Sequence, residues 1–223
     1  MKALAASLAA ISLVVWRSGA QVDFSTADSL YDVSFALASA ETSEVQLANP
    51  GFEIDAMSGA GLVVGATGWI TVVGAYTASG PLHPVHTGIG SLLLRSEHGL
   101  AFAVAVQKVA ASPGQIWDFQ GWGLRTTRLP TDTFGVLEIV FQDANGSPLS
   151  VAAGDVLIGE PGVGKVNALP RINNGTELNT WNLTQARAIA PVGTAQVEFV
   201  VLLVDVNPGE VYFDDVQATL IPE

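Results

Sequence analysis

Two adjacent aspartates near the end of the chain are the residues most clearly placed to do chemistry. Asp214 and Asp215 interrupt an otherwise apolar run at 211–216. Adjacent side chains of a β-strand point to opposite faces, so one carboxylate is expected at the core side or a buried edge, where an unpaired charge is costly. A cation held by oxygen ligands from distant parts of the chain is the natural compensation. Glu53 supplies another such carboxylate far upstream.

The elements that must position these groups are short strands. From residue 45 onward, apolar runs alternate with turns rich in Gly, Pro, Asn and Asp, and no helix of ordinary length, internal repeat or linker to a second domain is evident. Regular spacing of this kind predicts an antiparallel β-sandwich. The expected strands are 62–64, 69–75, 91–95, 101–109, 115–124, 135–142, 184–190, 195–205 and 210–220.

Four short motifs carry a family resemblance. They are NPGFE at 49–53, GIGSL at 88–92, QKVAASPGQIW at 107–117 and VYFDDV at 211–216. In this order the chain resembles the galactose-binding-like jelly rolls among the carbohydrate-binding modules, often appended to bacterial glycoside hydrolases. The resemblance covers about residues 46 to 221. It implies an all-β jelly-roll sandwich without catalytic activity.

The resemblance also implies a structural calcium ion that joins the first strand to the last. The residues of this chain that match the family's calcium ligands are Glu53, either Asp214 or Asp215, and backbone carbonyls around Gly88 or Gly90. Such an ion would neutralise carboxylates that otherwise repel one another. The alternative is that Glu53 and Asp215 are solvated turn charges.

Sugar binding needs aromatic faces flanked by amides and carboxylates. Alternation along three expected strands turns five such residues outward, and they would form a cleft if their strands line one concave sheet. The candidates are Trp122, Gln120, Glu138, Gln142 and Glu198, with Tyr76 and Trp181 as loop alternatives. Against this, a Trp in a β-sandwich is more often core or rim.

The N-terminus has the character of a secretory signal. Residues 1–20 combine one early lysine, an apolar run and small residues before Gln21, which predicts a cleaved signal peptide and a secreted protein without membrane insertion after cleavage. The alternative of a membrane anchor is disfavoured because the run is shorter than the ~20 apolar residues that span a bilayer. An extension is then expected at 21–44 and the jelly-roll domain at 45–223.

The extension contains one alternating stretch. Tyr31, Val33, Phe35 and Leu37 alternate with smaller or polar residues, which is typical of a half-buried strand. It is either an extra strand of the chain's own sandwich or a strand that adds to a neighbouring subunit and builds a polymer.

Composition narrows the class of protein. The 223 residues include no cysteine, so an exported fold would have no disulfide bond. A bound metal ion could cross-link distant parts of the chain instead. Lys and Arg total 9 against 21 Asp and Glu, a net charge of −12, which argues against nucleic acid and anionic lipid as partners.

Several motifs are set aside. The stretch 159–165 matches a P-loop, but Val166 replaces the magnesium-binding hydroxyl and Pro170 forbids the following helix, so a Gly/Pro loop is expected. No converging acid, base and nucleophile is evident, which predicts no enzyme activity. His83 and His86 lack helical zinc spacing and are expected in a solvated loop. Sequons occur at Asn145, Asn174 and Asn182.

Two functions therefore stand. One is a secreted, non-catalytic carbohydrate-binding module-like protein with structural Ca²⁺ and a polysaccharide or glycan as partner. The other is a structural or adhesive subunit of an extracellular filament, tube or sheath, assembled with copies of itself by N-terminal strand addition and calcium.

Overall fold

The computed structural model describes residues 43–45, 47–57, 59, 61–72, 74–96, 102–204 and 209–222. The expected signal peptide at 1–20 and the subunit-contact strand of Tyr31, Val33, Phe35 and Leu37 lie outside these residues and stay predictions. The regular elements of the described part are nearly all β-strands, and none of its helices is long and apolar enough to cross a membrane. The elements are β1 (Ser43–Val45), α2 (Glu53–Ala56), β2 (Gly61–Val64), β3 (Ile70–Thr71), β4 (Ala75–Ser79), β5 (Gly90–Arg95), β6 (Phe102–Ala110), β7 (Ile116–Leu124), β8 (Phe134–Gln142), the 3₁₀ turn η1 (Ala153–Asp155), β9 (Val156–Ile158), β10 (Glu160–Gly162), β11 (Lys165–Asn167), β12 (Asn182–Ile189), β13 (Gln196–Val204) and β14 (Glu210–Ile221).

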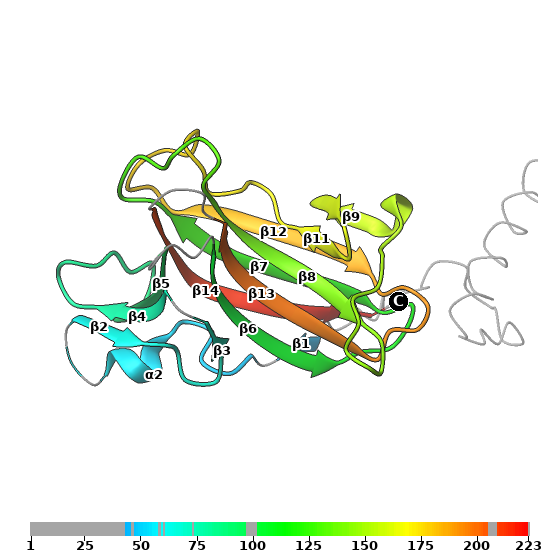
Figure 1. The fold of residues 1–223 in the computed structure, drawn as a ribbon. Coiled ribbons are helices and arrows are strands. Elements are labelled where there is room, and N and C mark those ends of the chain that lie inside the picture. Colours follow the sequence, from blue (N-terminus) through cyan, green and yellow to red (C-terminus); the bar gives the residue numbers. More distant parts are fainter. Residues whose placement is uncertain are drawn as a thin grey trace, which may run out of the picture. The chain divides into compact units, whose positions relative to one another are not determined.

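The strands form two antiparallel sheets with jelly-roll connections (Figure 1). Sheet A has the order β2-β4-β5-β14-β7-β12-β9, with β1 also paired to β14, and sheet B has the order β10-β11-β8-β13-β6-β3. The pairs β5·β14, β6·β13, β7·β12 and β8·β11 are nested and alternate between the sheets. This is the pairing of one long hairpin rolled up on itself, so the expected antiparallel sandwich and its jelly-roll class are confirmed.

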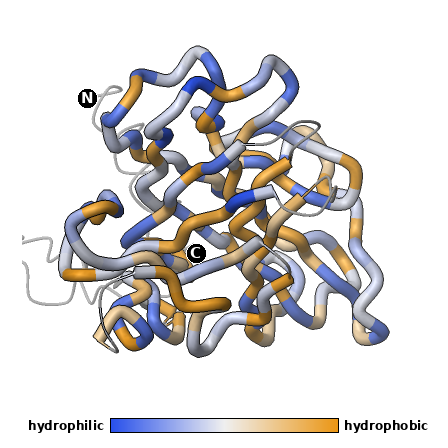
Figure 2. The backbone as a smooth tube through the Cα atoms, turned by 60° about the vertical axis from the view of Figure 1, so that its left-hand side comes forward, coloured by the Kyte–Doolittle hydropathy of each residue, from blue (hydrophilic) through white to orange (hydrophobic). Residues whose placement is uncertain are grey.

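The core lies between the two sheets because the sequence alternates along the long strands. On β7, Trp117 and Phe119 point inward, and on β13 Phe199 meets both of their rings at centroid distances of 5.7 and 5.0 Å. The same alternation is visible as changing colour along the tube in Figure 2. Tertiary packing of inward-facing apolar residues from both sheets is what fixes the sandwich.

Several elements differ from the sequence expectation. The expected strand 69–75 is two strands, β3 and β4, because Gly74 adopts a φ of 93° between them. A Cβ at Gly74 would lie 2.1 Å from the Arg95 carbonyl oxygen, so only glycine allows β4 to meet β5 at this point. Strands β1, β9, β10 and β11 were not expected. They are short and carry no clear pattern of their own: β1, β9 and β11 pair with strands far away in the sequence, and β10 pairs with β11.

The P-loop-like stretch is a tight hairpin. Glu160–Gly162 pairs with Lys165–Asn167 as β10 and β11 at the edge of sheet B. No helix follows it, so the rejection of a phosphate-binding loop is confirmed, whereas the expected irregular loop is in fact paired strand.

Candidate functional sites

The five expected sugar-binding residues are divided between the two sheets. Trp122 and Gln120 lie on β7, on the outer face of sheet A, while Glu138 and Gln142 on β8 and Glu198 on β13 lie on the outer face of sheet B. The single cleft predicted from these five residues is therefore wrong. The physical reason is the jelly-roll connection, which places the consecutive strands β7 and β8 in opposite sheets.

The sheet B members of this set are already paired with protein groups. Lys165 Nζ lies 2.6 Å from Glu138 Oε1, and Lys108 Nζ lies 2.9 Å from Glu198 Oε2. Gln142 Nε2 donates to Glu198 at 2.5 Å, and its Oε1 accepts from Lys108 at 3.2 Å. A sugar hydroxyl would have to displace these bonds, so the cluster has the character of a structural network.

On sheet A, three glutamines form one row across three neighbouring strands. Gln185 on β12 lies directly opposite Gln120 on β7, which lies opposite Gln217 on β14. All three are half-buried, and Gln120 Nε2 donates to Gln217 Oε1 at 2.9 Å. Each amide can donate twice and accept twice, so the row has hydrogen-bonding capacity beyond its internal contacts.

A charged row runs beside the glutamines. Asp118 on β7 pairs in register with Arg187 on β12. Its carboxylate accepts from Arg187 Nε at 2.6 Å and from Gln185 Nε2 at 2.8 Å, which fixes both donors. Asp118 is buried and Arg187 is about one third exposed, so the guanidinium is the accessible member of the pair. We call Asp118, Gln120, Gln185, Arg187 and Gln217 the polar face.

An aromatic wall closes one end of the polar face. The loop 80–89 between β4 and β5 crosses sheet A and stacks the His86 ring on Trp122 at 4.3 Å between centroids and 18° between planes. Trp181 meets the other side of His86 edge-on at 5.5 Å. Leu183, opposite Trp122 on β12, is exposed. The polar face thus ends against half-buried rings and an exposed aliphatic group.

The sequence carried a signal for some of these residues. On β12, every second residue is buried, and the residues between them face outward: Leu183, Gln185 and Arg187. This alternation predicts that Gln185 and Arg187 face outward, by the same reasoning that predicted Gln120 and Trp122 on β7. Gln217 could not be placed in this way, because the register of β14 shifts between Asp214 and Gln217. A bulge of this kind reverses the parity of every later side chain.

The expected metal ligands gather around the end of loop 80–89. Glu53, at the start of α2, accepts the backbone N–H of Ile89 at 2.8 Å. Asp215 accepts the Thr87 hydroxyl at 2.7 Å. Gly51 lies close to both carboxylates. A Cβ atom built on its backbone would lie 3.5 Å from Asp215 Oδ1 and 3.6 Å from Glu53 Oε1. The start of α2 and the last strand, β14, therefore bring these two carboxylates close to Gly51.

Asp214 occupies a different environment from its neighbour. It is fully buried beneath loop 80–89, and Oδ2 accepts the backbone N–H groups of His86 at 2.8 Å and Thr87 at 3.3 Å. Burial is the main cause that raises the pKa of Asp214 to about 7; the charge of Asp215 acts in the same direction, and the backbone N–H donors oppose it. Asp215 is half-exposed with a φ of 47°, which turns its carboxylate toward the Glu53 side.

The two histidines correct the expectation of a solvated loop. His83 Nδ1 lies 3.1 Å from the Tyr212 hydroxyl, and His86 Nδ1 lies 2.7 Å from Asp215 Oδ2. Both rings are half-buried because the loop is folded onto sheet A. Burial also raises the pKa of Tyr212 to about 12. The histidines therefore anchor the loop.

The carboxylates are engaged by donors of the protein itself. Within the part of the chain that the structure describes, no group of three or more His, Cys, Asp or Glu side chains is arranged to hold a metal ion. Gly88 and Gly90 lie against the Glu53 side chain and the Phe52 carbonyl. Glu53 and Asp215 offer hard carboxylate oxygens near the same point beside Gly51, which suits Ca²⁺ in ligand type.

No protein-family model and no curated protein matches the chain. Solved structures do resemble it. An arabinose-bound α-L-arabinofuranosidase gives a TM-score of 0.53 at 14% identity over 79% of this chain and 26% of that one. The enzymatically active domain of bacteriophage CBA120 tailspike protein 4 gives 0.49 at 19% over 78% and 21%. A family 16 carbohydrate-binding module gives 0.46 at 19% over 68% and 90%. The chain thus spans about a quarter of the first and a fifth of the second, and the likeness is one of fold.

Proposed function

We propose that this is a non-catalytic carbohydrate-binding protein that holds a glycan chain on the polar face of sheet A. The observation that carries the proposal is the row of Gln120, Gln185 and Gln217, bordered by the Asp118–Arg187 pair and ending at the aromatic wall. Fixed amides and a guanidinium match the paired hydroxyls of a sugar, and the rings and Leu183 offer apolar surface to its C–H faces.

The composition of the polar face supports binding rather than hydrolysis. Glycosidases use two carboxyl groups that flank the scissile bond. Among the described side chains of the polar face, Asp118 is the single carboxylate, and it is buried and bound to Arg187 and Gln185. We therefore assign binding without catalysis. Export by the predicted signal peptide belongs to the same proposal.

Removal of two glutamine side chains tests the proposed site. The double variant Gln120→Ala/Gln185→Ala should lose about two net hydrogen bonds of ~1 kcal/mol each, which weakens binding roughly 30-fold. Calorimetry or affinity electrophoresis against a panel of soluble neutral polysaccharides measures this loss. Gln196→Ala is the matched control, because Gln196 is a half-buried outward glutamine of sheet B. Equal losses in both variants, or no polysaccharide bound by the wild type, would exclude the polar face.

We also propose that a structural calcium ion binds between Glu53 and Asp215. Their placement close to the same point at Gly51 supports this, as does their origin in α2 and in the last strand, β14. Calcium would supply positive charge that links α2 to β14. Asp214 is the weaker candidate of the two aspartates because its oxygens already accept three backbone N–H groups.

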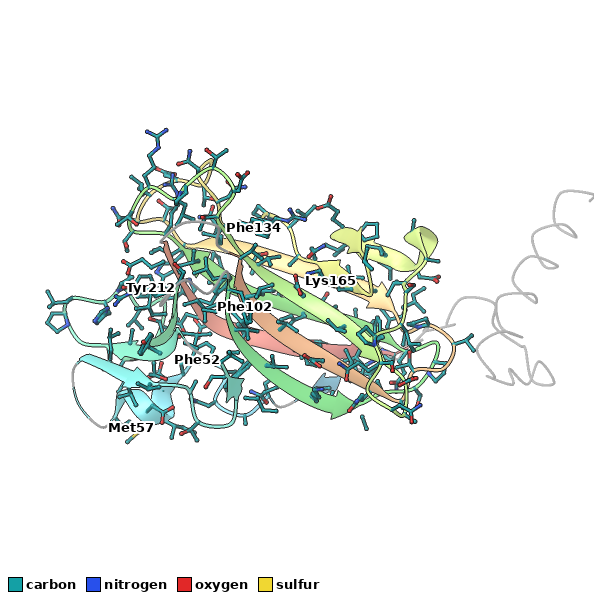
Figure 3. All side chains as sticks on the ribbon, in the orientation of Figure 1. Phe52, Met57, Phe102, Phe134, Lys165 and Tyr212 are labelled. Atoms are coloured by element: carbon teal, nitrogen blue, oxygen red, sulfur yellow. The ribbon has the colours of Figure 1, made fainter. Side chains whose placement is uncertain are left out.

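One observation favours the second candidate function, a self-assembling extracellular subunit. The outer face of sheet B exposes Ile70 and Phe102, with Val104, Val106 and Leu202 half-buried between them. In Figure 3, Phe102 and Phe134 lie at the same end of this sheet, and both flank Val204 in the register. The charges of this face are internally paired, as Lys108–Glu198 and Lys165–Glu138. Two copies of the chain, each with a net charge of −12, repel one another. This repulsion is weakest at a face that is apolar and has no unpaired charge, so a second copy would bind there.

A single charge on this face tests self-assembly. Ile70→Asp should convert assemblies of the mature chain into monomers, because an unpaired carboxylate would be buried in the contact. Sedimentation velocity measures the change, with Val192→Asp as control since Val192 is an exposed valine in the loop between β12 and β13, outside the strands of sheet B. A wild-type chain that stays monomeric at its highest soluble concentration would contradict this second function.

A further inference from the structure

A pocket lies beside β12, apart from the polar face. Its volume is about 620 Å³, which falls in the range of small-molecule sites. The walls come from the hairpin β10–β11, from the segment that follows it and from the start of β12. The lining residues are Glu160, Leu169, Pro170, Arg171, Asn173, Gly175, Thr176, Glu177 and Asn182.

A buried arginine fixes the loop that forms one wall of this pocket. Arg125, at the end of β7, is buried and donates to the carbonyl oxygens of Thr176 at 2.6 Å, Asn174 at 3.1 Å and Thr127 at 3.2 Å. The loop also closes on itself, since Gly175 N–H donates to Asn173 Oδ1 at 2.8 Å. The wall is therefore formed before any ligand arrives, which lowers the entropic cost of binding.

Arg171 is the central polar group of the pocket. Its Nη2 lies 2.7 Å from Glu160 Oε2, and its guanidinium carbon lies 4.8 Å from the centre of the Phe134 ring. The Arg171 Nε is buried without a hydrogen-bond partner in the described part of the chain. A buried donor without a partner is unusual in a native protein.

The lining chemistry selects the class of ligand. Glu160 and Glu177 outweigh Arg171 in charge, so an anion is disfavoured. The amides of Asn173 and Asn182 and the hydroxyl of Thr176 offer donors and acceptors suited to hydroxyl groups. Leu169, which is 45% exposed, and Pro170 supply an apolar wall. A small neutral molecule with several hydroxyls and one apolar side satisfies all of these groups.

We infer that this pocket is a second ligand site, which takes a single ring of a neutral sugar. The pocket would hold a chain end or a branch residue, whereas the polar face is a row of groups across three strands and suits several consecutive sugar residues. The inference stands on the pocket's own residues and needs no residue of the polar face.

Neutral and acidic methyl glycosides test the inference. The full mature chain, labelled with ¹⁵N, is titrated separately with the methyl glycosides of glucose, galactose, xylose and glucuronic acid. At least one neutral glycoside is expected to shift the amide signals of residues 173–176 and 182 in a saturable way, and the glucuronide should bind at least several-fold more weakly. Saturation by no neutral glycoside, or preference for the glucuronide, would overturn the inference.

Three variants test where the ring binds. Leu169→Trp fills the pocket without removing a polar group and should abolish the shifts, while Leu178→Trp, at a leucine of equal 45% exposure outside the lining, should leave them unchanged. Glu177→Gln, at an exposed side chain, should weaken binding roughly 5-fold by loss of a charged acceptor. Wild-type binding by Leu169→Trp would refute the site.

The proposals for the polar face and for the pocket can be tested independently. If Gln120→Ala/Gln185→Ala loses polysaccharide but keeps the methyl glycoside shifts, both assignments hold. Loss of the glycoside shifts in that double variant, with retention in Leu169→Trp, would move all sugar binding to the polar face and overturn the pocket. Retention of both activities in the double variant would overturn the polar face alone.

Discussion

In a buffer that chelates metal ions, the protein is expected to become less stable as the pH rises from about 4 to about 7. The group responsible is Asp214, fully buried under loop 80–89. Burial raises the pKa of this carboxyl from 3.8 to about 7 in the folded protein. A difference of about three pH units corresponds to a loss on the order of 4 kcal/mol in the free energy of unfolding.

The direction follows from which state holds the proton. Between the two pKa values the folded chain keeps the Asp214 proton while the unfolded chain has released it, so the native state binds more protons and stability falls as pH rises. Below about pH 4 both states are protonated, and above about pH 7 both are ionised, so the contribution of this group is flat outside the window. Paired carboxylates with depressed pKa values would give the opposite slope.

Urea unfolding at a series of pH values measures this loss, and carbon-detected NMR titration of the side-chain carboxyl groups reports the midpoint directly. Asp214→Asn removes one carboxyl, which both assigns the signal and should flatten the descending limb of the stability curve. A titration midpoint for Asp214 below about 5 would contradict the prediction, because it would mean that the backbone N–H donors outweigh desolvation.

Most of the fold could be predicted from the sequence, because alternation reports burial directly. The long strands β6, β7, β8, β13 and β14 each carry the period-2 pattern of a sandwich, and their expected bounds differ from the observed ones by at most one residue at either end. The short strands β9 to β11 carry no such pattern. They exist because β8 and β12 offer pairing partners, and that information lies in the tertiary structure.

The candidate site was harder to predict because a face is defined by strands that are neighbours in space. Trp122 and Glu138 both point outward, yet they lie on opposite faces of the sandwich, since the chain changes sheet between β7 and β8. Gln217 reaches the polar face only through the bulge in β14. His86 reaches Trp122 only because a loop folds across the sheet. No local sequence pattern predicts any of these three placements.

Calcium is expected to raise the melting temperature of the mature chain by about 5–10 °C. At 100 times its dissociation constant a ligand adds about 2.7 kcal/mol to the stability of the state that binds it, and in a domain of this size each kcal/mol is worth about 2–4 °C. Calorimetric scans in calcium and in chelator measure the difference. Magnesium should do less, because it demands a tighter octahedral set of oxygens.

Charge-neutral variants decide whether Glu53 and Asp215 supply the site. Glu53→Gln and Asp215→Asn keep the side-chain shape but remove the charge that a divalent cation requires, so each should lose most of the calcium effect. Asp132→Asn, at an exposed loop carboxylate, should keep all of it. Because a nearby cation favours the ionised form of Asp214, calcium should also reduce the fall in stability between pH 4 and 7. Stabilisation that survives in Asp215→Asn, or a pH profile unchanged by calcium, would place the ion elsewhere and leave the carboxylates as anchors of loop 80–89 alone.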